Sequence, residues 1–197
     1  MMAWTENGIR IFKLEVEDAE WLSLIAKKAY LDNYTHLWFD EGAWYAERCF
    51  NIEQLLKELS DDNSLFYGVA EGKEPLGFLK ININYPLSKM SCQSKDLSLL
   101  TYETEEIPNA LELERIYLSK NGQGKGIGQR LVQLTVDAAR SRGKGTVWLK
   151  AMDTSQAAIG FYEKMGFKTC GTMRLGFDVM KPEMQGMIAM KKDIFKH

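Results

Sequence analysis

The chain has 197 residues, 45% of them hydrophobic and 26% charged, which predicts one globular α/β domain over residues 1–197 with a buried core. A formal net charge of −2 gives no general attraction to nucleic acid or to an anionic membrane, and neither is an expected partner. No apolar run reaches the roughly 18 residues needed to span a bilayer, and the first ten residues, MMAWTENGIR, lack the pattern of a secretory signal.

Cysteine and histidine usage narrows the chemistry further. The three cysteines, Cys49, Cys92 and Cys170, are odd in number and have no Cys-x-x-Cys spacing, which indicates reduced thiols in a cytoplasmic protein. His36 and His197 are separated by most of the chain, so we expect no metal site. Little room is left for histidine-based catalysis.

The first half of the chain alternates between strand and helix patterns. Ile9–Val16 alternates apolar and polar residues and predicts a strand, after which acidic residues begin a helix that runs to about Tyr30. Ile52–Leu59 has the pattern of a second helix. Leu65–Ala70 and Leu76–Ile83 predict two strands that form an antiparallel hairpin.

The segment between the first two predicted helices is unusually aromatic. Its rings belong to Tyr30, Tyr34, Trp38, Phe39, Trp44 and Tyr45. They either pack two helices onto a sheet or line a groove for the acceptor substrate. In a groove, Asp32, Asp40 and Glu41 would suit a cationic substrate through charge pairing and cation–π contact.

The second half begins with an irregular stretch and then becomes strongly patterned. Pro86–Asn109 has no clear period, is rich in serine, and becomes acidic near its end, so we expect a long excursion. The elements predicted after it are strand Leu111–Leu118, helix Gly124–Arg142, strand Thr146–Ala151, a helix from Ser155 to Met165, and antiparallel strands Phe167–Phe177 and Met187–Ile194. The first strand, helix and second strand of this series predict a right-handed parallel unit.

The turn that opens the long helix, Gln123–Gly128 (QGKGIG), predicts an anion site. A helix start has unpaired N–H groups and partial positive charge, and glycine lets a ligand approach the backbone. Lys125 is followed by Gly126 rather than by Ser or Thr, so the turn is not a Walker-type loop. The glycine spacing also differs from the dinucleotide fingerprint. A glycine-rich helix cap without a ligand is the alternative at this point.

Two motifs resemble the GNAT family of N-acetyltransferases. Gln123–Gly128 is similar to the family's Gln/Arg-x-x-Gly-x-Gly/Ala pyrophosphate loop, which binds acetyl coenzyme A. Ala158–Phe167 (AIGFYEKMGF) resembles the family's Ala-x-x-Phe-Tyr-x-Lys-x-Gly-Phe segment, and it follows the loop after the expected helix and strand. Two shorter stretches, Phe50–Ser60 and Leu111–Tyr117, resemble the bacterial spermidine/spermine N-acetyltransferase (PaiA-like) branch.

This resemblance implies a fold and a cofactor. The fold is a central, mixed and twisted β-sheet of about seven strands flanked by about four helices, with an acetyl-CoA-binding core at about residues 111–167. The pantetheine arm pairs with the backbone of Ile116, Tyr117 and Leu118, where a main-chain N–H polarises the acetyl carbonyl. The pyrophosphate lies on Gln123, Gly124, Lys125, Gly126, Ile127, Gly128, Gln129 and Arg130.

Some of these assignments carry alternatives. Lys125 and Arg130 either add charge to the pyrophosphate site or are solvated helix residues. Ser155 stands where the family often has an asparagine that contacts the pantetheine arm, so this contact departs from the family's pattern. Tyr162 and Lys164 belong to the second motif and complete the expected cofactor site. Dimers are common in the family, which makes a homodimer an assembly that the resemblance implies.

Acetyl transfer to an amine also requires proton transfer. A lysine-like amine has a pKa near 10.4, so its neutral form costs about 4.6 kcal/mol at pH 7. Glu114 is the first candidate base, because it lies on the strand next to the expected pantetheine backbone, and Glu112, on the same face, is the second. Two neighbouring carboxylates would also raise one another's pKa. Both are otherwise solvated or salt-bridged strand residues. Tyr162 is the candidate general acid for the leaving thiolate, or else a buried aromatic beside Phe161.

The sequence therefore predicts an acetyl-CoA-dependent N-acetyltransferase that needs no metal and acts on a small cationic amine such as spermidine or spermine. The acidic excursion and the carboxylates of the aromatic segment favour a cationic acceptor. One alternative is acetylation of a protein N-terminus or lysine. Another is a non-catalytic acyl-CoA-binding module. A nucleotide-binding protein is disfavoured by the missing Gly-Lys-Ser/Thr.

Overall fold

The computed structural model describes residues 2–84, 102–104 and 109–195, and its contacts divide the chain into two compact units. Unit 1 comprises Met1–Asn82 and Glu114–Leu131, and unit 2 comprises Ile83–Leu113 and Val132–His197. Strand β6 (Ala110–Leu118) and helix α4 (Ile127–Arg140) each contribute residues to both units. The two units are described separately below.

Unit 1 contains an antiparallel sheet. Its strands are β1 (Met2–Glu6), β2 (Ile9–Lys13), β3 (Ser64–Glu71) and β4 (Glu74–Asn82), which follow one another in space, with β6 next to β4. The predicted hairpin is confirmed, because Leu65 lies opposite Ile81 in antiparallel register. Strand β1 was not predicted. Its signal is the dipeptide Asn7-Gly8, whose positive φ values of 50° and 80° suit a tight hairpin turn.

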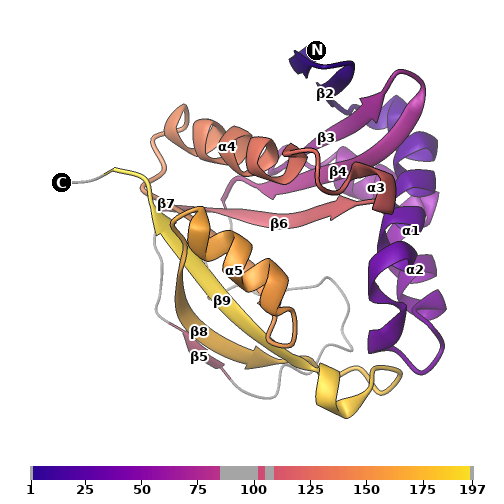
Figure 1. Ribbon diagram of the computed structural model, residues 1–197, viewed down its shortest axis with the longest axis vertical. Helices are drawn as coiled ribbons and strands as arrows, with labels where there is room; N and C mark the ends of the chain where they lie inside the picture. The colour runs from indigo at the N-terminus through magenta and orange to yellow at the C-terminus, as the bar shows by residue number, and fades with distance from the viewer. Residues whose placement is uncertain (1, 85–101, 105–108, 196–197) are drawn as a thin grey trace. The chain divides into compact units, whose positions relative to one another are not determined.

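Three helices pack together in unit 1 (Figure 1). They are α1 (Ala19–Tyr34), α2 (Ala43–Phe50) and α3 (Ile52–Leu59). Helix α1 buries Leu22 and Ile25 completely, and α3 starts where the Asn51 side chain accepts a hydrogen bond of 2.8 Å from the Gln54 N–H. Helix α1 extends four residues beyond the predicted end at Tyr30.

The aromatic segment of unit 1 forms a packed ring cluster. Tyr30 lies at its centre, with ring centroids of Tyr45, Tyr34, Phe50 and Tyr117 at 4.7, 5.1, 5.5 and 5.6 Å. Burial raises the pKa of the Tyr30 and Tyr117 hydroxyls, so both remain protonated. These contacts agree with the interpretation in which the rings pack helices onto the sheet.

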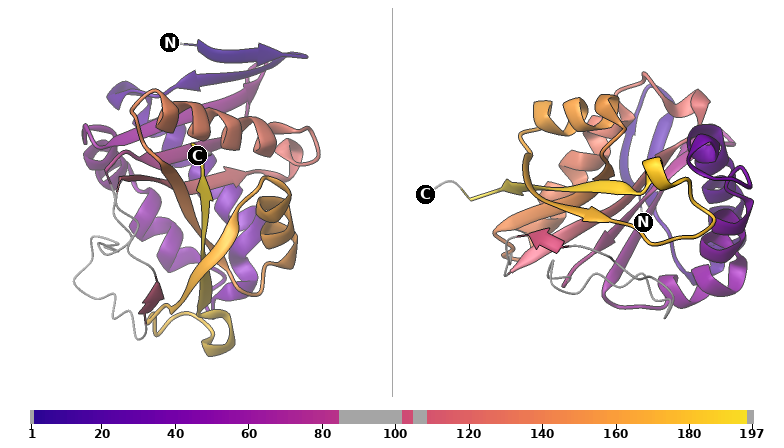
Figure 2. Two further views of the ribbon diagram at one scale, coloured as in Figure 1. Left: turned by 90° about the vertical axis from the view of Figure 1, so that its left-hand side faces the viewer. Right: turned by 90° about the horizontal axis from the view of Figure 1, so that it is seen from below.

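Unit 2 contains the other part of the sheet (Figure 2). Residues 110–113 of β6 pair in parallel with β7 (Thr146–Met152), which confirms the predicted parallel unit. Antiparallel pairs then join β7 to β9 (Gly186–Asp193), β9 to β8 (Lys168–Arg174) and β8 to β5 (Tyr102–Thr104). The antiparallel arrangement expected for the last two strands is thus confirmed. Trp148 of β7 and Ala189 of β9 are fully buried and belong to one hydrophobic cluster.

The described residues contain nine strands and five α-helices, slightly more than the sequence predicts. The elements that the sequence did not predict are β1, β5 and α2, which are all short. Strand β5 lies inside the predicted excursion Pro86–Asn109, and of the remainder of that excursion residues 86–101 and 105–108 are outside the described part of the chain.

Other sequence-based expectations concern the thiols, membrane spans and metals. Cys49 and Cys170 are present as thiols, whereas Cys92 lies outside the described residues. In the described part of the chain, no helix is long and apolar enough to cross a membrane. Within the same residues, no group of three or more His, Cys, Asp or Glu side chains has an arrangement that could hold a metal ion.

Candidate active site

The predicted pantetheine strand is β6, and its two parts have different neighbours. The parallel register with β7 runs from Ala110 opposite Thr146 to Leu113 opposite Leu149, so the remaining residues, Glu114–Leu118, lie beyond it. In unit 1 these residues lie next to β4. A Cβ on Gly77 of β4 would stand 2.3 Å from the carbonyl oxygen of Tyr117, so only glycine allows this approach.

The glycine turn follows β6 and opens α4. Gly124 and Gly126 both have φ of +74°, a left-handed conformation that favours glycine. Apart from each glycine and its two chain neighbours, no heavy atom of the described residues lies within 4 Å of the position that a Cβ would take on either residue. Helix α4 begins at Ile127 rather than at the predicted Gly124, because the glycines adopt non-helical φ values. The turn therefore presents open backbone at a helix start, where an anion is favoured.

Lys125 of the turn and Arg130 of α4 both have partners within unit 1. Lys125 Nζ lies 2.5 Å from Glu71 Oε2, and both side chains are partly exposed, so the pair contributes little stability. The Arg130 guanidinium lies over the Trp4 ring, 5.2 Å from its centroid. Sequence reasoning missed Glu71 and Trp4, because both are remote from the turn along the chain.

The end of α1 contacts the connection between β6 and α4. Gln123 Nε2 donates a hydrogen bond of 2.7 Å to Asn33 Oδ1, and Asn33 Nδ2 donates one of 2.9 Å to the Leu118 carbonyl. The Lys120 N–H donates to Asp32 Oδ2 at 3.1 Å. Desolvation raises the pKa of Asp32, but the Lys120 N–H and the Lys28 ammonium outweigh it, and the pKa is lowered.

These contacts alter the interpretation of the acidic residues in the aromatic segment. Asp32 accepts the Lys120 N–H, and Asp40 accepts the N–H groups of Gly42 and Trp44 at 3.1 and 2.7 Å. Both carboxylates therefore hold main-chain turns in unit 1. Glu41 is exposed and has a positive φ of 58°.

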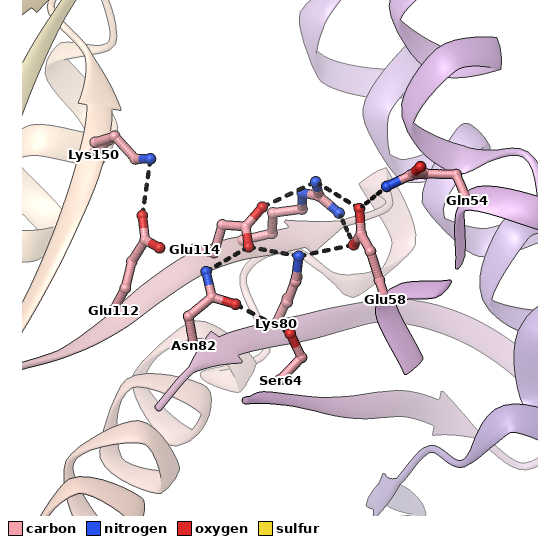
Figure 3. A network of polar contacts seen from close by, with 9 residues as sticks. Gln54, Glu58, Ser64, Lys80, Asn82, Glu112, Glu114 and Lys150 are labelled. Carbon is pink, nitrogen blue, oxygen red and sulfur yellow. Dashed lines mark hydrogen bonds and ion pairs between the residues drawn. The ribbon is translucent and has the colours of Figure 1, made fainter. Parts of the chain in front are cut away.

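Glu114 belongs to a network of four charged side chains in unit 1 (Figure 3). Lys80 Nζ lies 2.7 Å from Glu114 Oε2 and 2.8 Å from Glu58 Oε2. Arg115 contacts the same two carboxylates, each at 2.9 Å, and Asn82 Nδ2 donates to Glu114 Oε2 at 2.7 Å. Two cations thus balance two carboxylates in a region where Lys80 is 7% exposed and Arg115 8%.

The charge balance of this network affects Glu58. Burial raises the pKa of its carboxyl group, but Arg115 and Lys80 together outweigh burial, and the pKa is lowered. Sequence reasoning missed Glu58, Lys80 and Arg115. These residue types are ordinary on a helix or a strand, and only folding brings α3, β4 and β6 together at one point.

Glu112, the second candidate base, lies in unit 2. Its side chain is 1% exposed, and Lys150 Nζ lies 2.9 Å from its Oε1 (Figure 3). Glu112 and Glu114 are therefore both ion-paired, which was the alternative left open by the sequence.

Unit 2 also carries the second predicted motif, on α5 (Gln156–Lys164). The Tyr162 ring is half-buried between Phe161 and Phe167, with centroid distances of 5.1 and 5.8 Å. Ser155 precedes the first turn of α5 and makes no side-chain capping hydrogen bond there. Lys164 is exposed in the last turn.

The fold and these motifs agree with a comparison to known families. The model of the acetyltransferase (GNAT) family matches residues 24–167, and the chain belongs to this family of N-acetyltransferases. Acetyl-CoA is the acetyl donor of the family.

Relatives and a solved structure support the same family. An uncharacterised N-acetyltransferase of Lactobacillus delbrueckii subsp. lactis is 26% identical over 161 residues, covering 81% of this chain and 84% of the relative. The spermidine N(1)-acetyltransferase of Thermoplasma acidophilum is 26% identical over 167 residues, covering 82% and 89%. The ribosomal protein bS18 alanine N-acetyltransferase of Escherichia coli strain K12 is 31% identical, but over 64 residues that cover 32% and 43%.

Among solved structures, the fold is similar to that of the PaiA N-acetyltransferase of Thermoplasma acidophilum in complex with coenzyme A. The TM-score is 0.67 at 23% identity, with 94% of this chain and 98% of the other covered. At this identity the likeness concerns the fold alone. The acceptor of this chain is therefore a matter for proposal.

Proposed function

We propose that the chain, as a single N-acetyltransferase domain, transfers the acetyl group of acetyl-CoA to a primary amine of a small polyamine such as spermidine or spermine. The proposal that acetyl-CoA is the donor rests on the open glycine turn at the start of α4, where Gly124 and Gly126 leave the backbone accessible. Its N–H groups suit a pyrophosphate through hydrogen bonds and the helix dipole.

The other residues of the proposed donor site contact the pantetheine arm and the pyrophosphate of acetyl-CoA. Backbone groups of Ile116, Tyr117 and Leu118, beyond the β7 register, pair with the amides of the pantetheine arm. Lys125 and Arg130 add positive charge beside the pyrophosphate, and Gln123–Arg130 supplies the main-chain contacts. Ser155 and Lys164 are the proposed cofactor contacts of unit 2. The hydroxyl of Ser155 is available for this role because it does not cap α5.

In the proposed reaction the amine nitrogen attacks the acetyl carbonyl carbon, and a main-chain N–H of residues 116–118 stabilises the oxyanion. Collapse of this intermediate breaks the C–S bond, and Tyr162 donates its proton to the leaving thiolate. We propose Glu114 as the group that takes the amine proton, through water. Its side chain is 19% exposed, whereas that of Glu112, the second candidate, is 1% exposed.

A polyamine acceptor is supported by the long match to a relative named spermidine N(1)-acetyltransferase. The test is a steady-state assay of coenzyme A release with spermidine, spermine, an aminoglycoside and peptides with free N-termini. We expect the highest kcat/KM with a polyamine. Release that is absent with every amine contradicts the proposal.

Two other functions are distinguished by the same assay. The short match to an alanine N-acetyltransferase of a ribosomal protein favours a protein N-terminus as the second candidate acceptor. Faster turnover of an N-terminal alanine peptide than of spermidine selects that function. Tight binding of coenzyme A with no turnover of any amine identifies a non-catalytic acyl-CoA-binding module.

We also propose a cytoplasmic location, because the three cysteines are odd in number and lack paired spacing. A homodimer is the proposed assembly, on the ground of the family resemblance alone. Sedimentation velocity of the full chain distinguishes it from a monomer.

A further inference from the structure

Asn33, in the last turn of α1, uses its whole side-chain amide in hydrogen bonds. Its Nδ2 donates to the carbonyls of Ala29 at 2.7 Å and Leu118 at 2.9 Å. Its Oδ1 accepts from Gln123 Nε2 at 2.7 Å. The two partners outside α1 lie 85 and 90 residues further along the chain, so these are tertiary contacts.

The partners mark the two ends of one connection. Leu118 is the last residue of β6, and Gln123 immediately precedes Gly124, the first glycine of the turn. The neighbouring Asp32 accepts the N–H of Lys120, which lies within that connection. The end of α1 therefore holds the strand terminus, the middle of the connection and the start of the turn at three points.

We propose that Asn33 is a positioning residue for acetyl-CoA, which fixes the end of the pantetheine strand relative to the pyrophosphate turn. This inference rests on the proposed function, because it assigns ligand parts to Leu118 and to the turn. Coenzyme A spans both segments with a single chain, so an error in their spacing weakens contacts at one end. In this proposal Asn33 itself does not contact the cofactor.

The amide is chemically specific for this position. An aspartate has nearly the same shape and keeps the oxygen that accepts from Gln123. It lacks both N–H donors, however, and turns a carboxylate oxygen toward two carbonyl oxygens. Asn33→Asp thus removes the bond to Leu118 and leaves an electrostatic repulsion in its place.

Asn51 provides a matched control. Its Nδ2 also donates to two main-chain carbonyls, those of Glu47 at 2.9 Å and Arg48 at 3.1 Å. Its Oδ1 also accepts one hydrogen bond, from the Gln54 N–H at 2.8 Å. Asn51→Asp makes the same chemical change at the start of α3, without contact to β6 or to the turn.

The experiment compares both variants by isothermal titration with coenzyme A, by melting temperature, and by kcat and KM for acetyl-CoA. We expect Asn33→Asp to raise the dissociation constant of coenzyme A and the KM for acetyl-CoA about tenfold, with a smaller change in kcat. Asn51→Asp should lower the melting temperature comparably and change the dissociation constant less than about twofold. Equal coenzyme A affinities for the two variants overturn the inference.

A second variant keeps the inference testable if Asn33→Asp does not fold. Gln123→Ala removes the Gln123–Asn33 bond from an exposed side chain, and we expect coenzyme A binding about threefold weaker than in the unaltered chain. Unchanged affinity overturns the role of this bond in positioning. A wild-type chain that fails to bind coenzyme A instead overturns the proposed function, and the inference with it.

Discussion

Single residues of the charged network determine how much each carboxylate contributes to stability and to chemistry. Glu58 is the group through which α3 holds both Lys80 of β4 and Arg115 of β6. Desolvation of a charge is costly, and here each charge is offset by oppositely charged neighbours less than 3 Å away. Removal of one charged side chain from this network therefore leaves an excess of buried charge of the opposite sign.

Replacement of Glu58 tests this balance. Glu58→Gln leaves Lys80 and Arg115 with Glu114 as their remaining carboxylate, and we expect a loss of about 3 kcal/mol in the free energy of unfolding. Glu53→Gln on the same helix is the control, because Glu53 pairs with Lys57 at the exposed surface and should have little effect. Urea titration measures both, and similar losses for the two variants contradict the prediction.

The stability difference between the wild type and Glu58→Gln should also depend on pH. The pKa of Glu58 in the folded state is below its ordinary value of 4.5, so its carboxylate stabilises the fold above that pH. This contribution is lost as pH falls from 4.5 through the folded pKa. The difference in unfolding free energy between the wild type and Glu58→Gln should be constant from pH 6 to 7 and shrink below about pH 4.5. A constant difference down to pH 3 is the contrary result.

Glu114 has two assignments that one variant separates. If Glu114 takes the amine proton, Glu114→Gln lowers kcat by roughly 100-fold. If it acts only as an ion pair, the variant unfolds more easily but keeps kcat. Steady-state kinetics, with urea titration alongside, distinguishes these results. Glu112→Gln tests the second candidate in the same way.

Tyr162 is tested by removal of one oxygen atom. Tyr162→Phe keeps the ring between Phe161 and Phe167 but has no proton to donate to the thiolate. We expect kcat to fall roughly 100-fold while the KM for acetyl-CoA stays nearly constant. Tyr67→Phe on β3 is the matched control. Full turnover by Tyr162→Phe shows that Tyr162 is not the acid.

At the scale of elements, the glycine turn and α4 form one structure. Left-handed conformations at Gly124 and Gly126 bend the chain from β6 into the helix, and the absence of side chains there keeps its first amide groups accessible. Gly143, past the opposite end of α4, has a similar φ of +65°. Among the described residues, none beyond its chain neighbours has a heavy atom within 4 Å of its Cβ position. The two ends thus share a backbone conformation that favours glycine, but they differ in proposed function.

Alanine substitutions at the two ends of α4 should therefore have different effects on cofactor binding. Gly126→Ala and Gly143→Ala should each cost about 1 kcal/mol of stability, because alanine is strained at positive φ. Only Gly126→Ala should raise the KM for acetyl-CoA, by about tenfold or more, since its methyl group occupies the space next to the pyrophosphate. Equal KM values for the two variants would place the cofactor elsewhere.

For the whole molecule, ligand binding couples to the stability of the fold. A ligand that binds only the folded chain, present at 100 times its dissociation constant, adds about 2.7 kcal/mol. For a chain of this length this corresponds to a rise of roughly 5–10 °C in melting temperature. We expect coenzyme A to give such a rise and ATP to give none. A larger shift with ATP would favour the nucleotide-binding alternative.

Local sequence patterns determined most of the elements and the family. Periodicity gave the hairpin of β3 and β4, the helices α3 and α4, and the parallel pair of β6 and β7, because each pattern reflects which side chains are buried. The two motifs defined the family because the glycines and the Phe161-Tyr162 pair occur at fixed places in consecutive elements. Strand β5 has three residues, which are too few for a periodic signal.

Only the tertiary structure decided the partners of the charged and polar side chains. The sequence places Glu114 on a strand, but Lys80 and Glu58, which lie 34 and 56 residues earlier in the chain, determine its electrostatic environment. Asn33 meets Leu118 and Gln123 because α1 packs beside the end of β6, a contact that no local pattern encodes. Ion pairs and hydrogen bonds between distant residues depend on how the elements pack against one another. Periodicity, by contrast, shows within a single element which of its faces is buried.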